Sequence, residues 1–579
     1  MKTQKYSALF VLASAVLLMG CTDQAKGGMA RARLLADPAS PFEVTTNLAE
    51  TKEIHTARQK EYLAYEGEYV SIPEANYPDG QQHLSEPNPV NLAWNFSGSK
   101  TVSRYDVKVG QKADLSDGYV IKGTSAASLN VYNSFLGDNY FQIIANYADG
   151  TKDESAIQMY KVDEVYPRNL KIDGMTNCRD MGGGRTLEDG GKIKQGLIYR
   201  TSATTSWGNG RAVVPDSITN DGKEVLFNQL GVKTEINVNN GGDSHLSEVQ
   251  NYVSAKMYYD GGKHHLYRNG EPIKEVFHAL ADENNYPVFY HCRIGTDRTG
   301  LCAILISGLL GVSENEIYQD YLFSNFGNIQ EKRYIGDKAG RDNILNYIND
   351  LKAFPGEKFQ NKVYNYLLSI GVPASELDST INILTEGTKA QGNDNSQEAI
   401  LAEAFEAEGA EMKTETSQKH PKKYYTLGEN QSVIAEFNPN YNGEAKLVAY
   451  LGSSSSASFK INDSISATLD GNDVEISDEV TSTSAGFGQG DGRTYYSAVV
   501  LGTVNIVHGS TEVVITGKAN NLNIGAISII PMEKVTPADN KPNNNSKGCG
   551  GSIVATTSLI ALVAAAGASI LVFRKRKQD

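Results

Sequence analysis

Ten residues, His291 to Gly300, constrain the fold of this chain more than any other stretch. They read HCRIGTDRTG and stand between an apolar strand-like run, residues 286–290, and an apolar helix-like run, residues 301–306. A strand, a tight loop and a helix therefore follow one another, as in an α/β fold. The N–H groups of such a loop converge and the helix N-terminus adds partial positive charge, so the pattern predicts an anion-binding site.

The loop carries a nucleophile and a cation separated by five residues, Cys292 and Arg298. Its electrostatic field favours the thiolate of Cys292, and the thiolate is the nucleophilic form. The guanidinium of Arg298 is able to bind a phosphate group through two parallel hydrogen bonds. Together they predict attack of sulfur on a phosphate ester. The alternative is a buried structural cysteine in a strand–turn–helix.

Length and composition limit the remaining function classes. A chain of 579 residues predicts about three or four folded units. A formal charge of −14 argues against nucleic acid as a partner. The five cysteines are widely spaced, which predicts neither a disulfide framework nor a zinc site. His264-His265 is expected at the surface, and we expect no metal and no cofactor.

The N-terminus has the pattern of a secretory signal. Residues 1–20 begin with two lysines and continue as an apolar run that ends Leu18-Met19-Gly20. The following Cys21 resembles the acylated cysteine of bacterial lipoproteins, so residues 1–21 are expected to be a lipoprotein signal. An ordinary signal peptide followed by a coincidental cysteine is the alternative.

The C-terminus has the pattern of a membrane anchor. Residues 553–573 are uncharged and long enough to cross a bilayer as a helix, after a spacer at 536–552. The basic run Arg574-Lys575-Arg576-Lys577 marks residues 574–579 as cytoplasmic. We therefore expect a single-pass protein of a bacterial cell membrane, with its catalytic domain outside the cell.

Residues 22–77 are expected to be a tether, and residues 78–165 a β-sandwich. Short alternating strands are predicted at 90–94, 105–109 and 140–145. Trp94 on an early strand and the sequence LGDNY at 136–140 resemble fibronectin type III domains. The module is either a partner-binding domain or a spacer that packs on the catalytic domain, and we favour the spacer.

Residues 166–390 are expected to be an α/β catalytic domain between two β-sandwiches. It contains five ordered motifs, which resemble the bacterial atypical tyrosine phosphatases of the "tyrosine phosphatase 3" type. The motifs are NCRDMGG at 177–183, LIYRTS at 197–202, LGVKTEI at 230–236, the loop at 291–300, and LGVS with YLFSN between 310 and 325. The resemblance implies a phosphotyrosine phosphatase with a cysteinyl-phosphate intermediate. Some relatives also accept phosphoserine, phosphothreonine or phosphoinositides.

The resemblance also implies roles for the loop residues. Cys292 attacks phosphorus, and Arg298 holds two equatorial oxygens of the transition state. The hydroxyl of Thr299 is expected to bond the sulfur and help it leave, while His291 is expected to brace the loop. The phosphate is bound by the loop residues Arg293, Ile294, Gly295, Thr296, Asp297 and Arg298.

The general acid is the open question. The sequence has no Trp-Pro-Asp loop, and Asp297 matches the loop aspartate that relatives are thought to use. Its alternative role is a loop-stabilising hydrogen bond. Arg179 and Asp180 either shape the pocket or tie its floor together, and we favour the structural role for both.

Two positions depart from the family pattern. Asn237 and Asn239 stand where relatives usually carry Asp and Arg, which predicts a slow enzyme if that Asp takes part in catalysis. Thr296 stands where many relatives carry Lys, which favours phosphoprotein over phosphoinositide substrates, although Arg293 offers a compensating charge.

After a polar linker at 391–401, residues 402–535 are expected to be a jelly roll. Glu406-Ala407-Glu408 and the late strands at 511–516 and 524–529 resemble family 6/35 carbohydrate-binding modules. Such modules often bind a structural calcium, but Asn523 stands where an Asp is usual, so calcium is not expected. Glycan binding and a non-binding spacer both remain open.

These features lead to one main hypothesis and two alternatives. The main hypothesis is a cell-surface tyrosine phosphatase that acts on a phosphotyrosine protein or a small phosphoester. The first alternative is a surface adhesin or glycan-binding protein with a weak or inactive phosphatase domain. The second is a phosphoinositide phosphatase.

Overall fold

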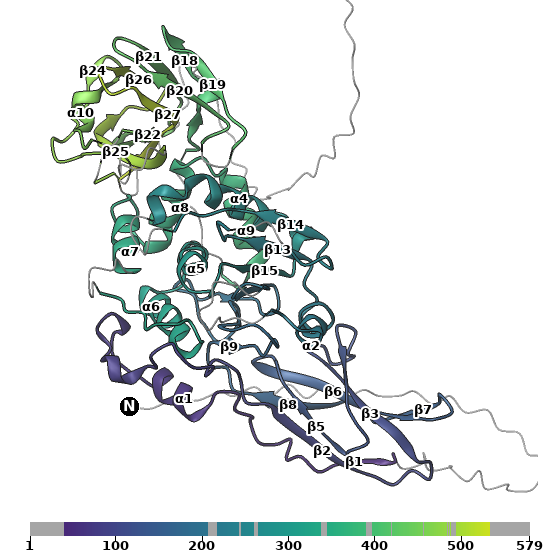
Figure 1. Ribbon diagram of the computed structural model, residues 1–579. Coiled ribbons are helices and arrows are strands. Elements are labelled where there is room, and N and C mark those ends of the chain that lie inside the picture. The colour runs from purple at the N-terminus through teal and green to yellow at the C-terminus, as the bar shows by residue number, and fades with distance from the viewer. Residues whose placement is uncertain are drawn as a thin grey trace, which may run out of the picture.

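The computed structural model describes residues 40–205, 217–241, 245–259, 265–336, 344–388, 397–417, 420–455, 457–482, 484–485, 487 and 494–532. Three folded units follow one another along an elongated molecule, with a sandwich at each end and the α/β unit between them (Figure 1). Cys21, the predicted signal peptide and the predicted membrane helix at 553–573 lie outside these residues. Within the described ranges, no helix is both long enough and apolar enough to cross a membrane.

The N-terminal unit is a sandwich of two antiparallel sheets, which confirms the three predicted strands. Trp94 is buried in its core and packs edge-on against Tyr105, with 5.3 Å between ring centroids. One sheet contains β1 (Phe42–Val44), β2 (Val90–Phe96) and β5 (Ser128–Val131). The other contains β4 (Tyr119–Lys122), β3 (Val102–Gly110), β6 (Gly137–Tyr147), β7 (Lys152–Glu154) and β8 (Gln158–Val162).

This sandwich also packs on the α/β unit. The buried Arg168 donates from Nε to the carbonyl oxygen of Ser134 at 3.1 Å and from Nη2 to that of Asn133 at 2.7 Å. The amide group of Gln195 exchanges two hydrogen bonds of 2.9 Å with the backbone of Leu136. The sandwich therefore has a polar, specific contact with its neighbour, as the spacer interpretation requires.

Residues 42–77 are folded, so the expected tether is wrong over this range. Strand β1 pairs with β2, and α1 (Ala57–Leu63), η1 (Tyr69–Ser71) and η2 (Glu74–Asn76) pack against the α/β unit, with α1 beside α6 (Figure 1). Tyr62 is fully buried, with its ring centroid 6.1 Å from that of Phe323 and 5.5 Å from that of Phe326. The segment looks polar locally because its apolar partners lie more than 250 residues away in sequence.

The middle unit is built on a six-stranded sheet in the order β14-β13-β15-β12-β10-β9. Four consecutive strands of this sheet are parallel: β12 (Ile198–Thr201), β15 (Val288–His291), β13 (Thr234–Asn237) and the edge strand β14 (Asn251–Ser254). The short strands β10 (Arg179–Asp180) and β9 (Arg168–Asn169) extend the sheet antiparallel. A two-stranded sheet joins β11 (Lys192–Ile193) to β16 (Thr385–Glu386). The predicted strand at 286–290 is confirmed and begins two residues later.

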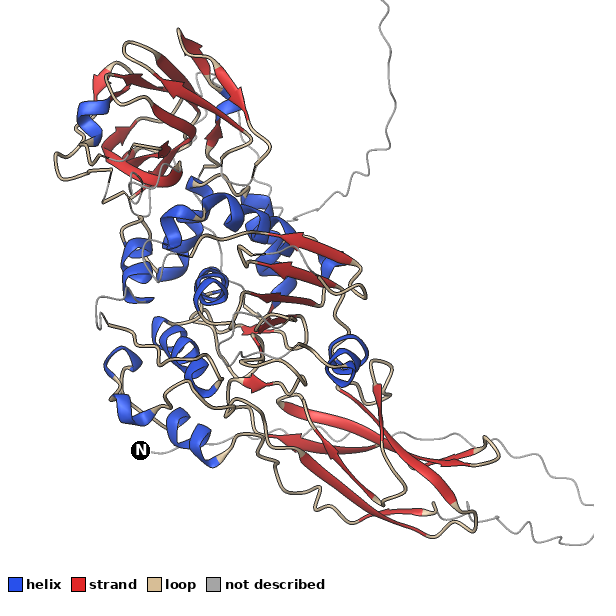
Figure 2. Cartoon of the chain, in the orientation of Figure 1, coloured by secondary structure: helices blue, strands red, loops and turns tan. Residues whose placement is uncertain are grey.

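The helices of this unit gather beside and above its strands (Figure 2). Almost every residue of α5 (Asp297–Leu310) is buried, because it is apolar on all sides. It ends at Gly311, whose φ of +88° is left-handed, and Ser313 then caps α6 (Glu314–Phe323) by accepting from the N–H of Glu316.

The remaining helices and helical turns of this unit have the following bounds. They are α2 (Asn220–Glu224), η3 (Val225–Gln229), α3 (His265–Arg268), α4 (Gly270–Leu280), η4 (Glu283–Asn285), η5 (Ser324–Phe326), α7 (Ile344–Lys352), α8 (Phe359–Ser369) and α9 (Ala374–Leu384). The last two confirm the helices predicted within 358–388.

The C-terminal unit is a second sandwich with its own apolar core. One sheet has β19 (Met412–Thr414), β20 (Lys423–Leu427), β27 (Leu522–Pro531), β22 (Gly443–Ser453) and β25 (Tyr495–Ile506), and β17 (Ile400–Leu401) pairs with β27. The other has β18 (Glu406–Glu408), β21 (Ser432–Phe437), β26 (Thr511–Gly517), β23 (Ile465–Leu469) and β24 (Asn472–Asp473). Short helices are η6 (Ala402–Ala404) and α10 (Ile461–Ser464). The pairing of β17 places the start of this sandwich at residue 400, within the expected linker.

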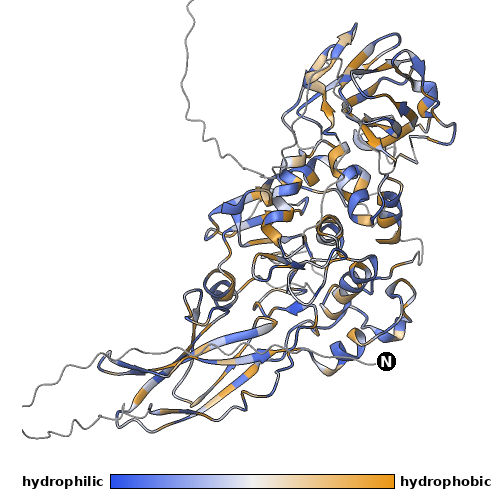
Figure 3. Ribbon diagram, turned by 180° about the vertical axis from the view of Figure 1, so that it is seen from behind, coloured by the Kyte–Doolittle hydropathy of each residue, from blue (hydrophilic) through white to orange (hydrophobic). Residues whose placement is uncertain are grey.

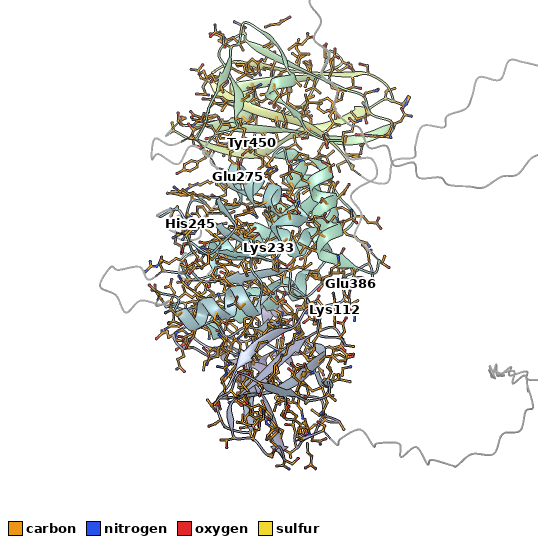
Figure 4. The ribbon with its side chains drawn as sticks, turned by 90° about the vertical axis from the view of Figure 1, so that its right-hand side faces the viewer. Lys112, Lys233, His245, Glu275, Glu386 and Tyr450 are labelled. Atoms are coloured by element: carbon orange, nitrogen blue, oxygen red, sulfur yellow. The ribbon has the colours of Figure 1, made fainter. Side chains whose placement is uncertain are left out.

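The α/β unit and the C-terminal sandwich share one apolar cluster. Tyr450 of β22 and Tyr496 of β25 are buried together with residues of the α/β unit, and Figure 4 shows Tyr450 at the boundary between the two units. A Cβ atom at Gly270 would collide with the hydroxyl of Tyr450. Apolar and polar residues alternate along the helices and strands, as expected for elements that have one buried face (Figure 3).

Candidate active site

The HCRIGTDRTG loop leaves the carboxyl end of β15, which lies between β12 and β13 in the sheet. Cys292 is the first residue after the strand, and α5 begins at Asp297. The carboxyl edge of a parallel sheet is where α/β proteins bind ligands, and the α5 N-terminus points its positive end at the loop. The predicted strand–loop–helix arrangement is therefore confirmed.

The loop bends at Gly295, where φ is +72°. A Cβ atom there would lie 2.7 Å from the carbonyl oxygen of Thr201, so only glycine fits this turn. The carbonyl oxygen of Gly295 accepts from Arg200 at 2.8 Å and from Asn177 at 3.0 Å. These bonds satisfy the loop carbonyl with donors from the protein, so it is already paired and does not need a partner inside the loop.

Cys292 is 1% exposed, and three neighbours determine its ionisation. Burial raises the pKa of the thiol, but the charge of Arg298 and the hydroxyl and N–H of Thr299 lower it more. The charge of Asp297 acts in the opposite direction, and the net pKa lies below the ordinary value for cysteine. The thiolate of Cys292 is therefore favoured.

The lowered pKa predicts reactivity at unusually low pH. The rate of Cys292 alkylation by iodoacetamide should have its midpoint below about pH 8.5, the ordinary thiol value, and the midpoint should rise in Arg298→Ala. Mass spectrometry of the peptide against pH measures it. Cys178 is an internal control, because burial raises its pKa to about 12. A midpoint at or above 8.5 in the unmodified chain would contradict the assignment.

Two residues that the sequence analysis did not select orient Arg298. Its Nη1 donates to Oδ1 of Asn240 at 2.8 Å, and its guanidinium carbon lies 5.2 Å from the centroid of the Tyr259 ring. Arg298 itself is only 6% exposed. A guanidinium held in this way is preorganised for bidentate contact with phosphate.

Asp297 is paired with Arg333, a residue 36 positions further along the chain. Nε of Arg333 donates to Oδ1 at 3.0 Å and Nη2 to Oδ2 at 3.1 Å. Burial lowers the pKa of Arg333, but the charge of Asp297 raises it more, so the net pKa is higher than usual. This bidentate contact favours the ionised carboxylate of Asp297. A general acid has to carry a proton, so the contact fits the loop-stabilising role better than the role of general acid.

A buried network of arginines lies beneath the loop. Asp320 of α6 forms ion pairs with Arg179 at 2.7 Å, with Arg185 at 3.5 Å and with Arg200, and it accepts from the hydroxyl of Tyr166 at 2.7 Å. Burial opposes ionisation of Asp320, but the arginines outweigh it and hold its pKa far below the ordinary value. Arg200 thus connects this network to the loop carbonyl of Gly295.

Arg179 and Asp180 lie behind the loop rather than in it. Asp180 is fully buried, pairs with Arg168 at 2.8 Å, and accepts from the N–H groups of Gly182 and Gly196. Arg179 bonds the side-chain oxygen of Asn177, whose Nδ2 contacts the loop carbonyls. These contacts fit the structural role that we favoured for both residues.

His291 is also placed to brace the loop. Its Nε2 lies 3.0 Å from Oε1 of the fully buried Glu235, and its Nδ1 lies 3.2 Å from the carbonyl oxygen of Cys292. Glu235 accepts in turn from the N–H of Leu246 at 3.0 Å. Both imidazole nitrogens therefore have protein partners, which fits bracing better than proton transfer.

The positions that depart from the family pattern lie close to the loop. Asn237 is 4% exposed, donates to the hydroxyl of Tyr252 at 3.2 Å and accepts from the N–H of Asn239 at 2.9 Å. The side chain of Thr296 is fully buried and contacts Asn177, so it points into the protein. Arg293 is half-buried, and Ile294 is 7% exposed.

Comparison with known proteins shows what this unit is similar to. Residues 170–367 match the model of the tyrosine phosphatase family. A tyrosine-protein phosphatase from Nostoc commune is 40% identical over 52 residues, which cover 9% of this chain and 18% of that protein. The chain thus spans about a fifth of the length of this curated relative.

Two solved structures show weaker similarity. One is a family 35 carbohydrate-binding module from Clostridium thermocellum, 16% identical, with a TM-score of 0.19, covering 23% of this chain and 96% of that one. The other is the core catalytic domain of PP-IP phosphatase SIW14 from S. cerevisiae in complex with citrate. It is 14% identical, with a TM-score of 0.19, and the match covers 29% of this chain and 82% of that one.

The region that matches the family model, 170–367, contains every loop residue and every bracing residue described above except Arg168 and Tyr166. Asn177 stands in the NCRD motif, so its position could have been found from the sequence. Asn240, Tyr259 and Arg333 belong to no local pattern, and only the fold brings them to the loop. Within the described ranges, no group of three or more His, Cys, Asp or Glu residues is arranged to hold a metal ion.

Proposed function

We propose that this protein is a tyrosine phosphatase that hydrolyses phosphate monoesters through a cysteinyl-phosphate. One observation supports this most directly. The charge of Arg298 and the neighbouring Thr299 lower the pKa of the nucleophile candidate Cys292, which lies in the same loop. A structural cysteine would need none of these features, since burial alone raises the pKa of a thiol, as it does at Cys178.

The reaction proceeds in two displacements. The sulfur of Cys292 forms a bond to phosphorus while the bond to the ester oxygen breaks, and the leaving oxygen takes up a proton. Arg298 binds two equatorial oxygens and stabilises the charge that spreads over them. Water then attacks phosphorus, inorganic phosphate leaves, and the Thr299 hydroxyl stabilises the returning thiolate.

Arg298 provides the first test. Full-length protein should hydrolyse p-nitrophenyl phosphate, and orthovanadate should inhibit it. Arg298→Lys should lower kcat/KM by about 10²- to 10³-fold, because lysine lacks the planar fork. Arg104→Lys is the matched control, since Arg104 pairs with Asp106 on the N-terminal sandwich, far from the loop. Failure of the unmodified protein to release nitrophenol would exclude the proposed function.

We also propose that the enzyme acts at the cell surface of a bacterium. The apolar run before Cys21 and the uncharged run at 553–573 support this location. The two antiparallel sheets of the N-terminal sandwich, with three and five strands, support a fibronectin type III-like spacer. Protease accessibility of the catalytic unit on intact cells, with lysed cells as the reference, tests the location.

The C-terminal sandwich is proposed to bind glycans, on the basis of its jelly-roll-like sheets and its Glu406-Ala407-Glu408 opening. Asn523 is occupied by neighbours rather than free for a calcium ion, since it donates to Tyr496 at 3.0 Å and accepts from Thr426 at 2.7 Å. Retention of the full-length protein on immobilised polysaccharides would support glycan binding, and uniform elution from all of them would count against it.

A further inference from the structure

Arg333 reaches Asp297 from a loop, residues 327–336, that follows η5. Residues 54–86, here called the strap, hold this loop. The N–H of Ile329 donates to the carbonyl oxygen of Gly80 at 2.8 Å, and the N–H of Leu84 donates to that of Phe326 at 2.7 Å. The loop that carries Arg333 is therefore paired through its backbone with a segment more than 240 residues earlier.

The strap also contacts the residues next to Arg333. Nζ of Lys332 donates to the carbonyl oxygen of Glu74 at 2.6 Å and lies 4.5 Å from the centroid of the Tyr77 ring. Gly80 has a φ of +74°, and a Cβ atom there would lie 2.8 Å from the carbonyl oxygen of Glu331. The strap thus packs closely on the backbone two residues before Arg333.

The inner side of the same loop is held by Asn325. Its Oδ1 accepts from the N–H of Arg333 at 2.7 Å, and its Nδ2 donates to the carbonyl oxygen of Arg333 at 3.1 Å. The side chain of Arg333 is only 11% exposed. The position of the guanidinium therefore follows from the backbone, which the strap and Asn325 hold between them.

We propose that the strap is part of the catalytic unit and that Arg333 is a positioning residue for the reaction. Through the 327–336 loop, the strap places the Arg333 guanidinium where it keeps Asp297 ionised and oriented beside Cys292. This inference rests on the proposed phosphatase function. The strap lies wholly outside residues 170–367, so the family match alone would leave it out of the enzyme.

The ionisation of Asp297 depends on charges from several elements. Among the described residues, those near it are Arg333 from the 327–336 loop, Cys292 and the adjacent Arg298 from the HCRIGTDRTG loop, Tyr321 from α6, and Tyr259 after β14. Glu331 pairs with Arg333. Arg333 makes two hydrogen bonds to the carboxylate. Without it, the Cys292 thiolate remains as a negative neighbour, and the carboxylate takes up a proton more readily.

Arg333→Gln in the full-length chain tests the role of Arg333. The limb of the pH profile of kcat/KM that reports Asp297 should move to higher pH by about 1 unit or more, because a neighbouring Arg lowers a carboxylate pKa by about 1–3 units. Arg333→Lys should restore most of the shift. An unchanged profile in an active enzyme overturns only this inference, whereas an inactive unmodified enzyme overturns the proposed function.

Gly80→Ala tests the strap, and Gly150→Ala is its matched control. Both glycines have left-handed φ values, +74° and +80°, but a Cβ at Gly150 would meet nothing within 4 Å. Gly80→Ala should lower kcat/KM by about 10-fold or more and speed hydrogen exchange in residues 327–336. Gly150→Ala should change neither. Equal activity and equal exchange in the two variants would overturn the strap's role, and the exchange result stands whether or not the protein is active.

Discussion

Cys292→Ser is expected to lower turnover of p-nitrophenyl phosphate by about 10⁴-fold or more, because loss of a covalent nucleophile removes the whole two-step path. Arg298 and Thr299 lower the pKa of the Cys292 thiol, which favours the nucleophilic thiolate. A serine hydroxyl at the same position does not ionise near neutral pH. Initial rates at saturating substrate measure the loss. Acid quenching of the unmodified enzyme with labelled substrate should trap phosphate on the peptide that contains Cys292.

The matched control is Cys178→Ser. Cys178 is 3% exposed and donates to the carbonyl oxygen of Thr176 at 3.3 Å, a bond that a serine hydroxyl can make. Its pKa of about 12 excludes a thiolate at neutral pH. We expect the activity of the Cys178→Ser variant to stay within a few-fold of that of the unmodified chain. Retained turnover in Cys292→Ser, or phosphate trapped on another residue, would refute the cysteinyl-phosphate path.

Asp320→Asn is expected to destabilise the catalytic unit by about 3–5 kcal/mol, the usual cost of removing one member of a buried charge network. Asp320 neutralises part of the positive charge of Arg179, Arg185 and Arg200, which are buried together. Without its charge, these guanidinium groups repel one another in the interior. Hydrogen exchange of α5 and α6 peptides measures the loss, since the protected core opens only when the unit unfolds.

The pH dependence of this effect has a definite sign. The folded pKa of Asp320 lies far below its unfolded value of about 3.9, so the stabilisation is complete above that value and declines as pH falls below it. The difference between Asp320→Asn and the unmodified chain should therefore shrink below about pH 4. Asp478→Asn is the control, because Asp478 is exposed and pairs only at the surface with Lys460, and we expect no measurable change. A constant difference down to pH 2 would contradict this account.

Much of the site was predictable because its signals are local. The spacing of Cys292 and Arg298 and the glycine between them lie within one strand–loop–helix, where covalent geometry leaves little freedom. Helix α5 followed from its unbroken apolar run. Local patterns also predicted three strands of the N-terminal sandwich and two late strands of the C-terminal one.

Other features were not predictable because their partners are distant in sequence. The tyrosines of the strap look like a polar lead-in until Tyr62 meets Phe323 and Phe326. Arg333 has no pattern of its own, and its ion pair with Asp297 depends on backbone contacts between the strap and the 327–336 loop. The arginines around Asp320 come from strands and loops that no local motif joins.

For this protein, the sequence by itself determined the chemistry of the loop: a nucleophilic thiol, an anion-binding turn and a guanidinium, all within ten residues. Only the tertiary structure decided what surrounds it: that Asp297 is held as a carboxylate by Arg333, and that residues 54–86 support the site rather than tether it. The physical reason is that the geometry of a short loop follows from neighbouring residues. The ionisation of a buried group depends on every charge the fold brings near it.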